Sequence, residues 1–224
     1  MNEIILNFFN LEILREVAPL LVQGFWMTLK LSVVSIPLAA ALGLALAITQ
    51  GASGRIGRTL VIAYVDVFRS IPPLVLLIFI FYALPFLGLR LTEFPAAILA
   101  LVLNGASYFA EIFRAGLESV PKGQHEAARS TGLGWRQSMQ YVIIPQGTRN
   151  VMPDLVSNTL ELAKQTSIAS AVALQELLRS AQLAQGMTYN ATPLIAAAVV
   201  YFLLFWPFVR LVSRLHQTSG SGAG

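Results

Sequence analysis

The side chains best suited to bind a small polar solute lie inside long apolar runs of the chain. Glu161 and Lys164 are three residues apart, so on a helix they share one face. Such a pair suits a zwitterion, with Glu161 holding an ammonium group. Asn104 and Tyr108, one helical turn apart in another run, add hydrogen-bonding groups. The alternative is that Glu161 and Lys164 only neutralise each other, with Lys164 extending toward the edge of the apolar layer.

Residues that perform bond chemistry do not converge anywhere in the sequence. Residues 125–129 resemble a zinc-protease helix, but Arg129 stands where the second histidine is needed. Residues 51–59 place five residues between two glycines where a phosphate-binding loop needs four, and Arg58 where it needs lysine. Cysteine is absent. We therefore expect no catalytic residue, no metal site and no cofactor bound by this chain, which disfavours a membrane-embedded enzyme.

The composition is that of a membrane protein. Of the 224 residues, 56% are hydrophobic and 12% are charged, whereas soluble domains carry about 25% charged residues. The mean hydropathy is +0.68. A chain with so few charges cannot cover a water-facing surface. The formal charge of +4 is dispersed along the sequence, which favours a topology signal over binding to nucleic acid.

Five segments are long and apolar enough to cross a bilayer, which takes about 20 residues. The Pro72-Pro73 pair should bend the second segment. The fourth segment carries a polar face, so we expect it to be buried within a bundle. We predict an all-α membrane fold, a five-span helical bundle. The predicted spans are residues 24–48, 61–84, 94–113, 151–178 and 193–212.

Small residues recur every four positions in the first predicted span, at Ala39, Gly43 and Ala47. Small residues at that spacing let helices approach closely in lipid. We interpret them as a packing face within this chain.

The distribution of basic residues indicates the orientation of the chain. Lys and Arg concentrate on the cytoplasmic side of membrane proteins. With the N-terminus outside, residues 1–18 form a periplasmic segment, residues 19–215 the transmembrane domain and residues 216–224 a flexible tail. This places the C-terminus in the cytoplasm. Nine basic residues then lie inside (Arg55, Arg58, Arg114, Lys122, Arg129, Arg136, Arg149, Arg210, Arg214) and three outside (Arg15, Arg90, Arg179).

A short polar segment between the third and fourth spans is predicted to form a helix of about two turns. Pro121 suits its start, because the missing N–H has no helical partner there. Glu126 lies in the first turn, where the helix dipole favours a carboxylate. Ala127 and Ala128 favour a helix without bulk, which fits a groove on another protein, and Gly132 supplies a positive-φ stop. The alternative is a solvated connecting helix that touches nothing.

The same segment matches a known motif: Glu-Ala-Ala, three residues, Gly, nine residues, Ile, one residue, Leu and Pro. Val142 and Ile144 replace the two aliphatic residues, and Pro145 completes the pattern. It resembles the loop by which permease subunits of ABC importers dock on their ATPase. Phe-Arg-Ser-Ile-Pro-Pro at 68–73 and Glu-Ile-Phe-Arg-Ala-Gly at 111–116 are similar to the polar amino-acid permeases, the histidine, glutamine, arginine and glutamate branch. The likeness covers about residues 20–215.

The resemblance implies the fold of a type I ABC importer permease. Such a permease lies in the bacterial inner membrane, translocates a polar amino acid and catalyses no bond chemistry. It implies three kinds of partner: an ABC ATPase dimer that binds the ATP, a second permease subunit, identical or closely related, and a periplasmic or lipid-anchored amino-acid-binding protein. The alternative is a stand-alone secondary transporter or channel for small polar solutes, which needs no docking helix. The implied ATPase-coupling residues, in a loop of about 120–136 and just beyond it, are Glu126, Ala127, Ala128, Arg129, Gly132 and Pro145.

Overall fold

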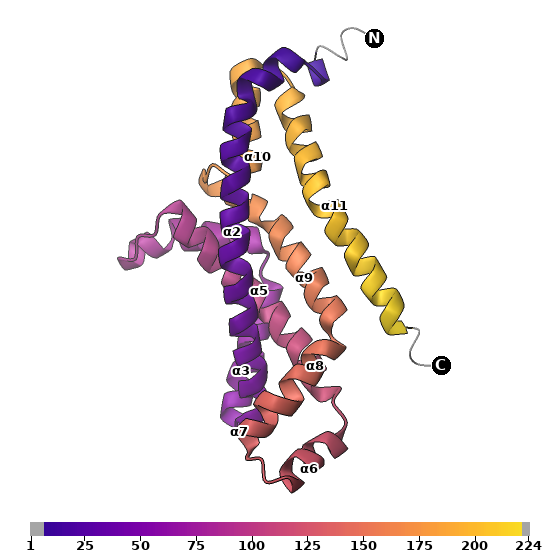
Figure 1. Cartoon of the computed structure of the whole chain (residues 1–224). Helices are drawn as coiled ribbons and strands as arrows, with labels where there is room; N and C mark the ends of the chain where they lie inside the picture. The colour runs from indigo at the N-terminus through magenta and orange to yellow at the C-terminus, as the bar shows by residue number, and fades with distance from the viewer. Residues whose placement is uncertain (1–6, 221–224) are drawn as a thin grey trace. The chain divides into compact units, whose positions relative to one another are not determined.

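The computed structural model describes residues 7–220, with side chains described as far as residue 213. Every regular element in that range is a helix (Figure 1). The chain forms two compact units from interleaved segments. Unit 1 comprises the described parts of Met1–Ile36, Pro72–Leu101 and Leu160–Leu211, and unit 2 those of Pro37–Ile71, Val102–Thr159 and Val212–Gly224.

Within the described residues, three helices are long and apolar enough to cross a membrane: α2 (Leu11–Ala52), α5 (Glu93–Glu118) and α11 (Thr192–Gly220), the last assessed over Thr192–Ser213. They cover the first, third and fifth predicted spans. A bent pair of helices brings the number to four if it is counted as one span. The membrane-spanning, all-helical prediction is confirmed, and the count of five spans stays a prediction.

Helix α2 is longer than the span predicted from its apolar residues. It takes in residues 11–18 of the predicted N-terminal segment. Its start is fixed by Asn10, whose side-chain oxygen accepts hydrogen bonds from the N–H groups of Glu12 (3.0 Å) and Ile13 (3.2 Å). At 1.5 Å per residue, its 42 residues extend about 60 Å, roughly twice the hydrocarbon thickness of a bilayer. The helix therefore continues well beyond the apolar layer.

The second predicted span is broken at its proline pair. Helices α3 (Arg55–Ser70) and α4 (Pro73–Tyr82) are bent by 98° at this point, and a short 3₁₀ turn, η1 (Leu84–Leu87), follows. The Phe68 carbonyl would normally accept from the N–H of residue 72, which Pro72 lacks. The Asn104 side chain supplies the missing donor at 2.7 Å. The predicted bend is confirmed, and at 98° it divides the span into two separate helices.

The fourth predicted span is not one continuous helix, and the expectation of helix across 151–178 was wrong. Helix α9 (Met152–Gln165) is 14 residues long, about 21 Å, and gives way to the 3₁₀ helix η3 (Thr166–Val172). The hydroxyls of Thr166, Ser167 and Ser170 each donate to the carbonyl three residues earlier, which tightens the turns. Ala173, with φ of 61°, ends η3 before α10 (Leu177–Thr188) begins.

The core of unit 1 joins the first half of α2 to α10 and α11 through small and aliphatic side chains. In Figure 1 the upper part of α2 lies beside α10. Gly24 marks the closest approach, because a Cβ there would lie 2.8 Å from the Glu176 carbonyl oxygen. The buried members of this core are Val17, Leu21, Leu177, Ala181, Ala184 and Ala197.

The predicted packing face on α2 is confirmed in unit 2. Ala39 and Ala47 are buried. A Cβ on Gly43 would lie 2.5 Å from the Phe109 Cβ and 2.9 Å from the Ala110 nitrogen, so α2 and α5 meet almost backbone to backbone. Small residues here act inside this chain, as expected.

Helix α11 exposes most of its apolar side chains, including Phe202, Leu203 and Trp206. This is the pattern of a helix that faces lipid or another membrane helix. The helix also runs through residues 216–220 of the predicted tail, and residues 221–224 lie outside the described part of the chain.

Candidate functional site

The predicted polar helix is present as α6 (Lys122–Ser130), which starts directly after Pro121. Its end is a Schellman turn at Gly132, whose φ is 84°. The Gly132 N–H donates to the Arg129 carbonyl at 3.0 Å, and the Leu133 N–H donates to the Ala128 carbonyl at 3.3 Å. Gly132 takes a left-handed conformation that a side chain would strain. The predicted helix and its positive-φ stop are confirmed. The expectation that Glu126 lies in the first turn was wrong, because the helix begins at Lys122 and its first turn holds no acidic residue.

The two faces of α6 differ. Ala128 is buried, whereas Glu126, Ala127 and Arg129 are exposed. Neither Glu126 nor Arg129 forms an ion pair within the described residues. One face therefore packs against the rest of unit 2, and the other presents charged and small side chains outward.

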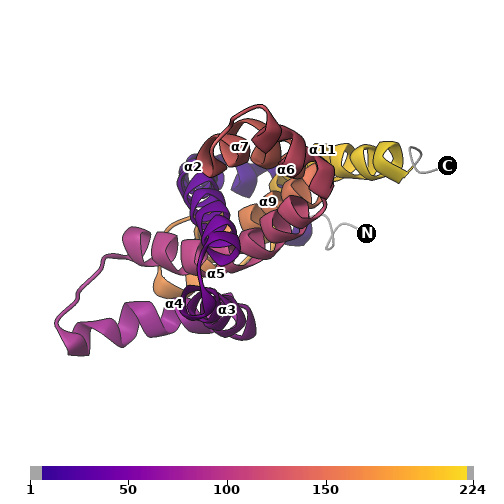
Figure 2. The same ribbon diagram turned by 90° about the horizontal axis from the view of Figure 1, so that it is seen from below.

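The segment after α6 holds it in place. Helix α7 (Trp135–Ser138) leads into a π-helical turn, η2 (Met139–Ile143), and then into α8 (Ile144–Asn150). Pro145 lies in the first turn of α8, where a regular α-helix would press its ring against the carbonyl four residues earlier. The wide π turn just before it relieves that clash. Figure 2 shows α6 and α7 close together, joined by a short loop.

Helices α5 and α8 cross at a pair of glycines. A Cβ on Gly116 would lie 2.6 Å from the Gly147 carbonyl oxygen, and one on Gly147 would lie 2.8 Å from the Gly116 oxygen. Two side-chain hydrogen bonds flank the crossing: Asn150 donates to the Ser119 hydroxyl at 2.8 Å, and Gln146 donates to Gln124 of α6 at 3.3 Å. The α6 loop is thereby anchored to the end of a membrane-spanning helix.

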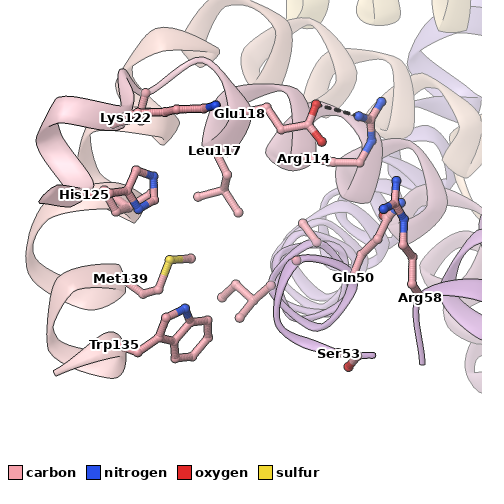
Figure 3. Close-up of a pocket in the computed structure, with 15 residues that line it drawn as sticks. Gln50, Ser53, Arg58, Arg114, Leu117, Glu118, Lys122, His125, Trp135 and Met139 are labelled. Carbon is pink, nitrogen blue, oxygen red and sulfur yellow. Dashed lines mark hydrogen bonds and ion pairs between the residues drawn. The ribbon is translucent and has the colours of Figure 1, made fainter. Parts of the chain in front are cut away.

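A cavity of about 500 Å³ lies within unit 2 between α6–η2 and the facing ends of α2, α3 and α5 (Figure 3). Four of its lining residues are basic: Arg58, Arg114, Lys122 and His125. Glu118 is the only acidic one, and it pairs with Arg114 at 2.8 Å. Sequence reasoning missed this cavity because separate segments of the chain contribute its walls.

The predicted polar pair on α5 has two separate environments. The amide nitrogen of Asn104 is taken up by the α3 carbonyls, which leaves its buried Oδ1 without a hydrogen-bond partner in the described structure. The Arg69 guanidinium lies over the Tyr108 ring, with its Cζ 5.2 Å from the centroid of that ring. Arg69 also approaches Glu111 at 3.8 Å, while Arg114 contacts the same carboxylate at 3.0 Å. A band of charge thus follows one side of α5.

Glu161 and Lys164 meet on α9, in unit 1. The Lys164 Nζ lies 3.3 Å from a Glu161 carboxylate oxygen, and the two side chains are 46% and 59% exposed respectively. The neutralising pair is therefore formed, and both groups stay open to a further partner. Lys164 also borders a second cavity of about 500 Å³, otherwise mostly aromatic, lined by Ser167, Tyr201, Phe202, Phe205, Trp206 and Val209.

A buried carboxylate that sequence reasoning missed lies at the start of α10. Glu176 is fully buried and accepts hydrogen bonds from the N–H groups of Leu178 (3.0 Å) and Arg179 (2.8 Å). It also accepts from the Tyr201 hydroxyl at 2.7 Å, and Thr28 receives the Leu177 N–H at 3.1 Å. Glutamate is not a preferred N-cap residue, so the sequence carried only a weak signal.

Comparison with known proteins identifies the class to which this fold and loop belong. Residues 39–218 match the family described as the binding-protein-dependent transport system inner membrane component. The chain belongs to this family: it is a membrane-embedded permease subunit of an ABC importer, and it is not an enzyme. The Glu-Ala-Ala loop is a feature of the family. Membership implies, in general terms, an ATPase and a binding protein as partners.

Among its relatives is a probable glutamine ABC transporter permease protein of Bacillus subtilis, 35% identical over 197 residues that cover 86% of this chain and 90% of the relative. The arginine transport system permease protein of the same organism is 35% identical over 188 residues, covering 83% and 86%. An amino acid ABC transporter crystallised with histidines has a TM-score of 0.81 at 34% identity, covering 92% of this chain and 96% of that one. An inward-facing methionine ABC transporter has a TM-score of 0.74 at 25% identity, covering 89% and 96%.

Proposed function

We propose that this permease moves a polar amino acid across the bacterial inner membrane, driven by an ATPase dimer that docks on α6. A second permease subunit, identical or closely related, completes the pathway. A periplasmic or lipid-anchored binding protein delivers the amino acid. The substrate class is supported by relatives named for glutamine and arginine. The observation that carries the proposal is the outward face of α6, held on an anchored loop and offering unpaired charges.

The coupling residues have distinct roles in this proposal. Glu126 and Arg129 place opposite charges on the exposed face of α6, which suits a polar groove on a partner. Ala127 has a small side chain, which allows the ATPase to approach the backbone of α6 closely. Gly132 fixes where the helix stops, and Pro145 shapes the π turn behind it. Because α8 crosses the membrane-spanning helix α5 at two glycines, a displacement of α6 and the loop that holds it is transmitted to α5.

A crosslinking experiment tests the docking face. A photo-reactive amino acid replaces Ala127, which is exposed on α6, or Phe202, which is exposed on α11. In membranes that also contain the ATPase, we expect an adduct to the ATPase from position 127 and none from position 202. An assembled complex without an adduct at 127, or with equal adducts at both positions, contradicts docking through α6.

Glu161 is our candidate for the group that holds the substrate ammonium, with Lys164 beside it. A carboxylate within a membrane domain is costly unless it is paired or wetted. Glu161 is paired at 3.3 Å yet 59% exposed, so it can exchange Lys164 for a substrate ammonium. Tyr108 and the free Oδ1 of Asn104 are the further candidates for contacts along the path.

The Glu161 assignment is tested by comparing a single and a double substitution. Glu161→Gln keeps the volume and removes the charge, so we expect uptake to fall and the preference among amino acids to change. If Glu161 only neutralises Lys164, the double change Glu161→Gln, Lys164→Gln restores uptake with an unaltered preference. That recovery counts against substrate contact.

The orientation is tested by cysteine labelling, which needs no prior removal of cysteines because the chain has none. We propose that the N-terminus is outside and α6 is in the cytoplasm. A cysteine introduced at Gln124, exposed on α6, should resist an impermeant thiol reagent in sealed cells and react after lysis. Labelling from outside in sealed cells contradicts this orientation.

A further inference from the structure

We propose that the basic cavity of unit 2 binds the phosphate group of an anionic phospholipid, and that the bound headgroup links α6 to α3. The cavity is lined by Arg58 of α3, by Arg114 of α5, and by Lys122 and His125 of α6. In Figure 3 the Lys122 side chain extends inward from α6, and Arg58 and Arg114 come from the opposite wall. The proposal is independent of which substrate the permease carries.

The charge of the cavity wall is unbalanced. Arg114 forms ion pairs with Glu111 at 3.0 Å and with Glu118 at 2.8 Å. Arg58 and Lys122 have no ion pair within the described residues. Two cations on facing elements therefore lack a counter-charge, and an anion between them supplies it.

A buried amide supplies further donors. Gln50 lines the cavity, and its Oε1 is buried with no hydrogen-bond partner in the described structure. A buried polar atom without a partner is costly. The oxygen and nitrogen of a glutamine amide exchange by a half-turn of the terminal group. After that turn, the NH₂ group takes the place of the unpartnered oxygen, and Gln50 adds hydrogen-bond donors to the cavity wall.

Apart from Ser53 and Gly51, the rest of the cavity wall is apolar, which favours a lipid over a free phosphate ion. At about 500 Å³ the cavity lies within the usual range of about 300–1,000 Å³ for small-molecule sites. It accepts a headgroup and glycerol, with the acyl chains left outside. Trp135 at its edge is 52% exposed, as expected of an aromatic side chain at a membrane interface. The apolar lining residues are Ala47, Ile48, Leu117, Val120, Met139 and Ile143.

The position of the cavity along the helices agrees with an interfacial site. It lies at the C-terminal ends of α2 and α5, two helices that meet the criteria for membrane spans. In the proposed orientation these ends face the cytoplasmic leaflet, where anionic lipids bind basic pockets between helices. Because Lys122 and His125 belong to α6, occupancy of the site restrains the ATPase-docking helix against α3.

The test measures lipid retention by the purified permease–ATPase complex. The complex is placed in nanodiscs with equal amounts of phosphatidylglycerol and phosphatidylcholine, extracted, and analysed by native mass spectrometry. We expect retained phosphatidylglycerol in excess of phosphatidylcholine. Each of Arg58→Gln and Lys122→Gln should lower its retention about fivefold, in line with the usual contribution of one basic residue near a membrane. Arg58→Lys should keep it.

The matched control is Arg55→Gln, which removes the same charge from the first turn of α3 at a residue that does not line the cavity. We expect less than a twofold change for this control. Equal losses in Arg55→Gln and Arg58→Gln overturn the proposal, because they indicate general attraction to an anionic surface. Displacement of phosphatidylglycerol by millimolar inorganic phosphate overturns the lipid assignment. Persistence of the lipid against phosphate supports the lipid assignment.

Discussion

Substitution of Gly147 by alanine should loosen the loop that carries α6, the helix on which we propose that the ATPase docks. A Cβ at this position would lie 2.8 Å from the Gly116 oxygen, 2.9 Å from the Gly116 carbonyl carbon and 3.1 Å from the Leu117 nitrogen. All three are backbone atoms of α5, so no side chain can rotate away and α8 itself must shift. Overpacking of this kind costs about 1–3 kcal/mol. For a chain of this size we expect the midpoint of thermal unfolding to fall by about 2–12 °C.

The assay compares the thermal stability of the purified permease with ATP-dependent uptake in vesicles. Gly123→Ala is the matched control, because Gly123 lies on α6 with no atom within 4 Å of a Cβ. It should keep both stability and uptake, since alanine favours helix. We expect Gly147→Ala to lower stability and to reduce uptake more than it reduces ATPase binding. Unchanged stability and uptake in Gly147→Ala refute the backbone-to-backbone crossing of α5 and α8.

Three further substitutions probe groups that sequence reasoning assigned to another role or missed. Asn104→Ala leaves the Phe68 carbonyl without its donor at the proline break, and should cost about 1–3 kcal/mol, seen as a lower thermal midpoint. A variant as stable as the parent contradicts the role of Asn104 as the hydrogen-bond donor to the Phe68 carbonyl. Glu176→Leu removes the cap of α10 and the partner of the Tyr201 hydroxyl, with a cost of about 1–3 kcal/mol, whereas Tyr201→Phe should be milder. Equal effects of these two changes contradict the role of Glu176 as a cap.

The membrane class, the family and the polar helix α6 could be predicted from sequence because their signals are local. Apolar length identifies the membrane spans. Proline and glycine mark the two ends of α6, so a helix of about two turns over 124–131 could be predicted, and the structure places it two residues earlier at its start, at 122–130. Motif spacing then pointed to the family.

The breaks and buried contacts could not be predicted because they depend on residues distant in the sequence. The apolar periodicity of 151–178 gave no sign that three hydroxyls would tighten the chain into η3. Asn104 was predicted as a substrate-binding group. In the structure its amide donates to the Phe68 carbonyl, which lacks its helical donor because residue 72, 32 positions before Asn104, is a proline. The Glu176 cluster and the basic cavity each combine segments that are distant in the sequence. A single sequence cannot reveal such pairings.

The most direct test of coupling through α6 is Gly132→Asp. A Cβ at φ of 84° is disfavoured by about 1–2 kcal/mol, and the new carboxylate lies at the end of α6, the helix on which we propose that the ATPase docks. Gly54→Asp is the matched control, since Gly54 is exposed, has φ of −65° and has no atom within 4 Å of a Cβ. Co-purification of the ATPase and substrate-stimulated ATP hydrolysis are measured together with uptake. We predict that the Gly132→Asp subunit reaches the membrane but loses the ATPase, or keeps it with hydrolysis that no longer responds to substrate. Normal assembly, stimulated hydrolysis and uptake in Gly132→Asp would show that the loop is a passive connector.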